Sequence, residues 1–98
     1  MKLKIEKTLP SSTKKWMAIF TRPGGTSIRT QFGAKGYEDY TIHKDKTRRE
    51  HYRNRHRKDL DTGDFTRAGF LSYYLLWGDS TSLKKNTIDF KKKFGIEK

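Results

Sequence analysis

The chain has 98 residues, the length of one ordinary domain, and a domain this short buries only a modest core. It carries 23 Lys and Arg against 11 Asp and Glu, a net charge of +12, and it has no cysteine, which excludes disulfides, thiolate metal sites and a cysteine nucleophile. Apolar residues make up only 32% of the chain. Aromatic residues reach 13%, too many for a disordered polar tail, so we expect a folded domain with an aromatic-rich core.

The N-terminal segment alternates charged and apolar residues instead of forming the apolar stretch of a signal peptide. The longest apolar run, residues 70–77, contains Ser72 and is far too short to cross a bilayer. The sequence therefore predicts a protein without a visible secretion signal and without a membrane-spanning segment.

Three strands are predicted at residues 2–7, 14–21 and 26–32, and apolar and polar residues alternate in the first and the third. The second of these segments has apolar residues on both faces, so both of its faces are expected to be covered. Residues 22–25, with Pro and two Gly, supply the turn into the third strand. Together the strands form a small antiparallel meander over residues 2–33.

Residues 37–44 are expected to form an ordered loop. Asp45 is the predicted N-cap of a helix over residues 46–58, since its carboxylate can accept the free N–H groups of the first turn. Asp64 is the predicted N-cap of a second helix over residues 65–77. That second helix is apolar nearly all round, a pattern typical of a central, buried helix.

A third helix is predicted to begin at Ser80 or Thr81 and to end at Phe94, before Gly95. Its expected buried stripe consists of Leu83, Thr87, Phe90 and Phe94. The whole chain is then one α+β domain, in which a three-stranded N-terminal meander is followed by three helices in a helical part over residues 45–95.

Positive charge is densest between Lys44 and Lys58, where Lys and Arg surround the predicted helix instead of forming one stripe. A surplus of this size usually serves a negative partner, and Arg in particular grips phosphate oxygens. The alternative is a solvated helix in which Glu50 pairs with Arg53 or Asn54. We favour the first interpretation because the surplus extends over the whole chain. The predicted nucleic-acid-binding residues are Lys35, Lys44, Lys46, Arg48, Arg49, Arg53, Arg55, Arg57 and Lys58.

Tyr37, Tyr40 and Tyr52 lie among these cations and are candidates for stacking on bases of a single strand. More often such tyrosines are half-buried with the hydroxyl at the surface. This second interpretation is the preferred one.

His43, His51, Asn54 and His56 suggest a ββα metal nuclease, since neutral imidazoles bind divalent ions that activate water. The spacing argues against it: His51 and His56 are five residues apart, on different faces of a helix, and no acidic base or Cys pair accompanies them. We therefore predict no catalytic residue, no metal and no cofactor.

Two segments, residues 32–45 and residues 68–77, together with Arg49, Tyr52, Arg55 and His56, carry a resemblance. They are similar to a family of small uncharacterised basic proteins encoded by large double-stranded DNA viruses of eukaryotes. The similarity extends from Phe32 to Phe94. It implies a viral setting, with the protein in the virion or in the nucleus or cytoplasm of the host cell, and it carries over no activity.

These observations predict a non-enzymatic virion protein that binds nucleic acid through phosphate contacts with little sequence specificity. The alternative is a minor capsid or cement protein whose basic surface bridges acidic capsid faces or a membrane. The surplus charge suits either partner.

Overall fold

The computed structural model describes residues 1–97 and opens with one antiparallel sheet. Its strands β1 (Lys2–Lys7), β2 (Lys14–Thr21) and β3 (Ser27–Ala34) lie in the order β1-β2-β3. The predicted meander is confirmed, with β3 reaching two residues beyond the predicted end. Gly33 permits this extension because it adopts a φ of +77°, a conformation that other residues rarely take.

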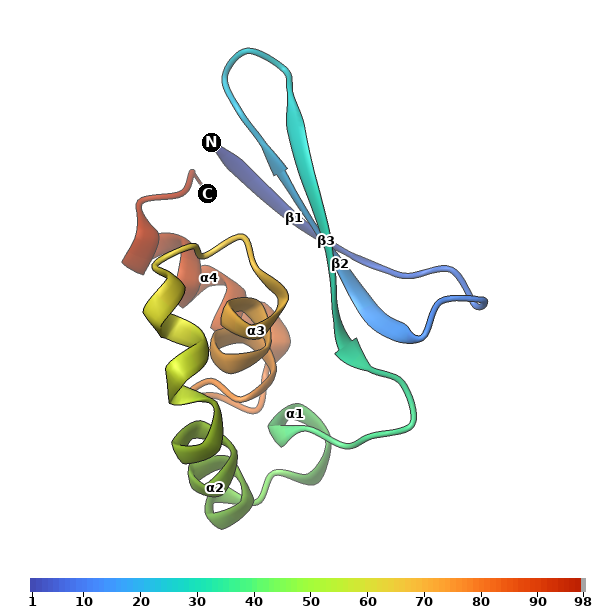
Figure 1. Cartoon of the computed structure of the whole chain (residues 1–98), viewed down its shortest axis with the longest axis vertical. Helices are drawn as coiled ribbons and strands as arrows, with labels where there is room; N and C mark the ends of the chain where they lie inside the picture. Colours follow the sequence, from blue (N-terminus) through green and yellow to red (C-terminus); the bar gives the residue numbers. More distant parts are fainter. Residues whose placement is uncertain (98) are drawn as a thin grey trace.

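The helices α2, α3 and α4 all lie on one side of the sheet (Figure 1). On that side Ala18 and Phe20 of β2 and Phe32 of β3 are fully buried. The expectation that both faces of β2 are covered is wrong, because Met17 and Ile19 on the opposite face are only half-buried. Long polar side chains of the neighbouring strands flank them, and the stems of such side chains cover apolar surface without a second layer. The flanking partners are Lys4, Glu6, Arg29 and Gln31.

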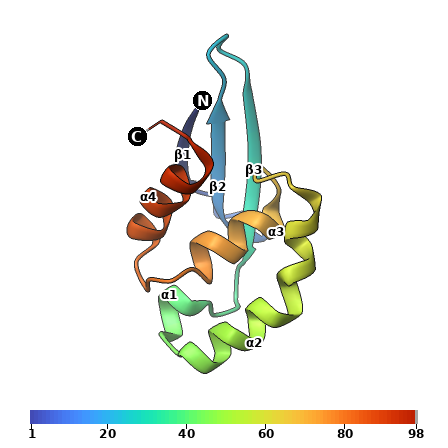
Figure 2. The ribbon, with the colours of Figure 1, turned by 90° about the vertical axis from the view of Figure 1, so that its left-hand side faces the viewer.

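Four α-helices follow the sheet, where three helices were predicted. They are α1 (Tyr40–His43), α2 (Lys46–His56), α3 (Ala68–Leu71) and α4 (Leu83–Phe94). A 3-10 helix, η1 (Arg57–Thr62), extends α2, and a π-helical turn, η2 (Ser72–Leu76), extends α3. Figure 2 shows α3 and α4 in front of the sheet and α2 below its lower end. Within residues 1–97, no helix combines the length and the apolarity that crossing a bilayer requires.

The predicted loop at residues 37–44 contains α1, a single helical turn. The buried Asp39 carboxylate caps it by accepting hydrogen bonds from the N–H and the hydroxyl of Thr41. Asp45 is confirmed as the N-cap of α2, since its carboxylate accepts the N–H groups of Thr47 and Arg48. The 3-10 geometry of η1 takes over at residue 57, within the predicted helix.

Asp64 does not cap a helix. Its carboxylate accepts from the N–H and the hydroxyl of Thr66, which closes a turn, and α3 begins only at Ala68. The prediction of a buried central helix is nevertheless confirmed for this segment, in which Phe70, Leu71, Leu75 and Leu76 are buried.

α4 begins at Leu83, with Ser82 as its N-cap, and not at Ser80 or Thr81. It ends before Gly95, as predicted, where φ is +67°. Its buried residues are Asn86 and Phe90. The polar Asn86 was absent from the expected apolar stripe. The predicted aromatic-rich core is confirmed. Its rings come from β2, from residues 65–74 and from α4, and they are Phe20, Phe65, Phe70, Tyr74, Phe90 and Phe94.

Candidate nucleic-acid interface

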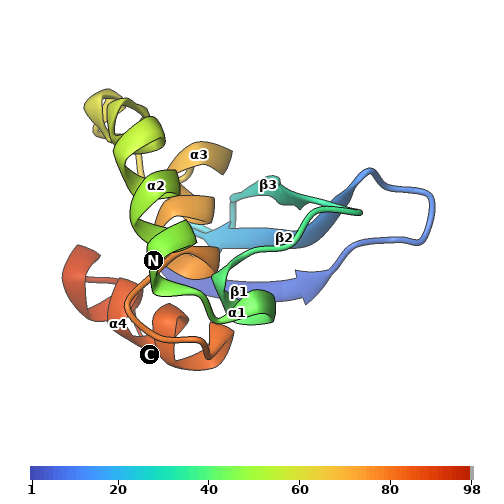
Figure 3. The ribbon, with the colours of Figure 1, turned by 90° about the horizontal axis from the view of Figure 1, so that it is seen from below.

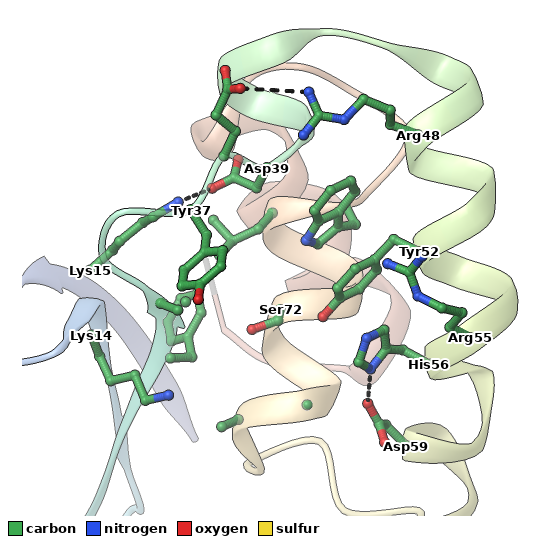
Figure 4. A pocket seen from close by; sticks show the side chains of 18 of the residues that line it. Lys14, Lys15, Tyr37, Asp39, Arg48, Tyr52, Arg55, His56, Asp59 and Ser72 are labelled. Carbon is green, nitrogen blue, oxygen red and sulfur yellow. Dashed lines mark hydrogen bonds and ion pairs between the residues drawn. The ribbon is translucent and has the colours of Figure 1, made fainter.

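A cleft of about 530 Å³ opens between α2 and the ends of β2 and β3. α3 lies between α2 and the sheet and, with η2, forms the base of the cleft (Figure 3). Lys14 and Tyr37 line it from the side of the sheet, Arg48 and Arg55 line it from α2, and Ser72 lies at the base (Figure 4).

The α2 wall is a stripe of residues at helical spacing. Arg48, His51, Tyr52 and Arg55 follow one another at i, i+3, i+4 and i+7, which places them on one face of the helix, and all four line the cleft. Two arginines of α2, Arg48 and Arg55, thus lie along the cleft, which the count of charges around the helix did not reveal.

Tyr52 is held in an aromatic stack. Its ring lies against Trp77 on one face, with centroids 4.2 Å apart and planes at 4°, and against His56 on the other, at 4.1 Å and 23°. Its hydroxyl points into the cleft toward Ser72 (Figure 4). Burial, with a smaller contribution from the Asp59 carboxylate, raises the pKa of Tyr52 to about 12. The phenol is therefore neutral at physiological pH.

The three carboxylates of the cleft each have a cationic or imidazole partner. Asp39, which is buried, forms an ion pair of 2.8 Å with Lys15. The Nδ1 atom of His56 lies 3.0 Å from Asp59, and Glu38 lies 3.6 Å from Arg48. Since these carboxylates already have partners, their repulsion of an incoming anion is reduced.

Two arginines of the predicted set are used inside the protein. The Arg49 guanidinium lies over the Tyr40 ring, 4.8 Å from its centroid, and pairs with Glu50. Arg53 is 18% exposed; its Nε donates to the carbonyl of Trp77 at 2.8 Å and its Nη2 to Asp79 at 3.0 Å. Arg49 and Arg53 are therefore poor candidates for phosphate ligands, because both are partly buried and two nitrogens of each guanidinium already hydrogen-bond within the chain.

Other predicted cations remain at the surface. Lys44, Lys46, Arg55 and Lys58 are exposed, and the described part of the chain shows no ion pair for any of them. Arg57 is exposed and contacts Asn54. Lys35 is exposed and donates to the carbonyls of Leu9 and Pro10 at the β1–β2 turn, so the structure places it apart from the cleft lining.

The three candidate tyrosines differ in how far their rings are exposed. Tyr40 is buried beneath Arg49, and both faces of Tyr52 are covered, so neither can stack on a base. Tyr37 is 74% exposed and lines the cleft. Of the three candidates for base stacking, only Tyr37 has an exposed ring.

Sequence reasoning missed Lys14, which lies across the cleft from α2. Its position at the start of β2 gave no signal, because only the folded chain brings it opposite Arg55. The three histidines do not converge, and within residues 1–97 no group of three His, Cys, Asp or Glu is arranged to hold a metal ion. His43 instead packs on Trp77 and accepts the N–H of Asp45.

Comparisons with known proteins give one match. A family of unknown function, DUF5754, matches residues 7–56, which run from the end of β1 to the end of α2 and include Lys14, Tyr37, Arg48 and Arg55. No curated protein and no solved structure matches the chain. With half of its length matched, the chain belongs to the DUF5754 family, whose function is unknown.

Proposed function

We propose that the protein binds nucleic acid without altering it chemically, through phosphate contacts made along the cleft and the exposed surface of α2. The observation that carries this proposal is the pair of exposed cations Lys14 and Arg55, which have no ion pair in the described chain and line opposite walls of one cleft. The chain as a whole carries a net charge of +12. Lys and Arg that contact phosphates release condensed counterions, which supplies binding free energy independent of base sequence.

Low sequence specificity follows from the kind of contacts available. Phosphate contacts position a protein on nucleic acid, whereas specificity requires side chains that reach base edges. No reaction is assigned to the cleft: among the described residues His56 hydrogen-bonds only Asp59, and no hydroxyl donates to its ring. A location in the virion or in the host cell stays a prediction that rests on the viral resemblance.

The proposal is tested by titrating salt against affinity. We expect the Kd for a labelled oligonucleotide to rise roughly 50- to 150-fold between about 50 and 200 mM salt, the value for about four phosphate contacts. The double variant Lys14→Ala/Arg55→Ala should bind more weakly and with a shallower salt dependence. The matched control, Lys84→Ala/Lys92→Ala, removes the same charge from exposed positions of α4 outside the cleft.

Two results would overturn the proposal. A Kd that does not change with salt would exclude phosphate contacts. Equal losses of affinity in the two double variants would show that the net charge of the whole protein binds the oligonucleotide, and that the cations of the cleft contribute no more than other surface cations.

The alternative role as a minor capsid or cement protein uses the same cations against acidic protein or membrane surfaces. Polyglutamate added as a competitor distinguishes the two partners. Displacement of the oligonucleotide at an equal concentration of negative charge would favour the capsid role, and failure to displace it would favour nucleic acid.

A further inference from the structure

Contacts between cations and phosphates do not explain the exposed aromatic ring of Tyr37 at the cleft. It lies between β3 and α1 and is 74% exposed. No aromatic partner packs on its ring among the described residues. In Figure 4 the ring stands on the sheet side of the cleft, across from Tyr52. A free aromatic face beside exposed cations is the combination that holds the bases of a single strand.

The wall opposite Tyr37 is rigid and polar at its edge. Because Tyr52 is fixed between Trp77 and His56, its hydroxyl has a defined position, and the Ser72 hydroxyl lies next to it (Figure 4). Each hydroxyl can both donate and accept a hydrogen bond. Such groups satisfy the edges of any base without selecting one.

Small residues of β3 and α3 also line the cleft, namely Gly33, Ala34, Ala68 and Gly69. Both glycines are closely packed against neighbouring side chains. A Cβ on Gly33 would lie 2.7 Å from a Leu76 methyl group, and a Cβ on Gly69 would lie 3.1 Å from the Asp59 side chain. The volume of about 530 Å³ falls within the range of small-molecule sites, about 300 to 1,000 Å³.

We infer that the cleft receives one unpaired nucleotide, whose base stacks on Tyr37, while Lys14 and Arg55 contact phosphates of the same strand from opposite walls. This inference rests on the proposed function and adds that the preferred partner is single-stranded nucleic acid. In a duplex both faces of each base are covered by its neighbours, and exposing them costs a few kcal/mol. A duplex can therefore use the cations but not Tyr37.

The experiment compares three ligands at one salt concentration: an oligothymidylate of about 12 nucleotides, a duplex of the same length, and thymidine 5′-monophosphate. We expect the oligothymidylate to bind more tightly than the duplex. Tyr37→Ala should weaken oligothymidylate binding roughly 5- to 100-fold, the equivalent of losing one base–aromatic stack, and should leave duplex binding nearly unchanged. Tyr37→Phe, which keeps the ring, should bind within about twofold of the unmodified protein.

Leu9→Ala is the matched control, because Leu9 is 73% exposed and lies outside the cleft. It should change neither affinity. Trp77 gives a second readout, since it lines the cleft and stacks on Tyr52. In a Trp16→Phe background, we expect oligothymidylate to quench Trp77 fluorescence more than the duplex does.

The outcomes separate the two proposals. If Tyr37→Ala weakens both strand forms equally, or neither, the inference fails while salt-dependent binding still supports the proposed function. If thymidine 5′-monophosphate binds as tightly as the oligothymidylate and depends equally on Tyr37, the nucleotide site is supported, but its ligand is a free nucleotide and the proposed function fails. If no ligand binds, both fail.

Discussion

The two sides of α2 carry the same residue types in opposite roles. Arg53 and Arg55 are two residues apart, yet Arg53 is bound to the Trp77 carbonyl and to Asp79, whereas Arg55 is exposed along the cleft. A guanidinium that loses water must find acceptors within the protein, because an unpaired buried charge is costly. Position around the helix, and not residue type, therefore decides which cations are available to a ligand.

The side of α2 that carries Arg53, which we call the inner side, takes part in a polar network that contacts residues 77–80. Arg53 contacts this segment from α2, and Asn86 contacts it from α4. The Asn86 side chain accepts the N–H of Ser80 and donates to the carbonyls of Leu75 and Ser80. This network joins α2, η2 and α4, so we expect substitutions in it to affect stability, and substitutions along the cleft to affect binding.

The largest loss of stability is expected for Asn86→Ala. The substitution leaves three backbone polar groups without their partner in a buried site, and we expect the free energy of unfolding to fall by roughly 3 kcal/mol. Urea unfolding measures this change. The control is Asn54→Ala, on the exposed surface of α2, which should change stability by less than about 0.5 kcal/mol. Equal effects at the two positions would show that the network is not what holds residues 77–80.

Two single variants, Arg53→Ala and Arg55→Ala, test directly whether the two sides of α2 have different roles. Loss of the Arg53 contacts should lower the free energy of unfolding by about 2 kcal/mol, since hydrogen bonds of charged groups contribute about 1.5 to 3 kcal/mol. Arg55→Ala should change it by less than about 0.5 kcal/mol but should weaken oligonucleotide binding more than Arg53→Ala does. Urea unfolding and fluorescence anisotropy on the same two proteins measure both effects. The reverse order in either assay contradicts the division of α2 into two sides.

Features set by neighbouring residues could be predicted from the sequence. The strands β1 and β3 follow from alternation, β2 follows from an apolar run that ends at a Pro-Gly-Gly turn, and Asp45 and Gly95 mark helix ends through contacts within one turn. The same reasoning gave a wrong prediction for Asp64, because an Asp side chain can close a turn with the residue two positions later as readily as it can cap a helix. The choice between the two depends on packing that a local pattern does not contain.

The candidate site was only partly predictable because long-range contacts assemble it. Arg55 and Tyr37 could be singled out from composition, whereas Lys14 joins them only through the fold. The burial of Tyr40 beneath Arg49 likewise depends on α1 packing against α2. A count of charges treats Arg49 and Arg55 alike, and only the partners of each guanidinium separate them.

A small effect on stability at neutral pH is expected for Tyr52→Phe, which keeps the ring in its stack with Trp77 and His56. Below about pH 9 the phenol is protonated in both folded and unfolded chains, and stability should change by less than about 1 kcal/mol. Above that pH the unfolded chain releases the proton near its ordinary pKa of 10.0, while the folded protein keeps it until about 12. The unfolded state then binds fewer protons, so the unmodified protein loses stability as pH rises through this window.

Tyr52→Phe has no proton to release at this position, so its stability relative to the unmodified protein should increase between about pH 9 and pH 11.5. Lysines titrate in the same range, but they are common to both proteins and cancel in the difference. Urea unfolding at several pH values measures that difference. A difference that stays constant over the window would mean that the Tyr52 hydroxyl is as accessible to water in the folded protein as in the unfolded chain, and that its place beside Ser72 does not bury it.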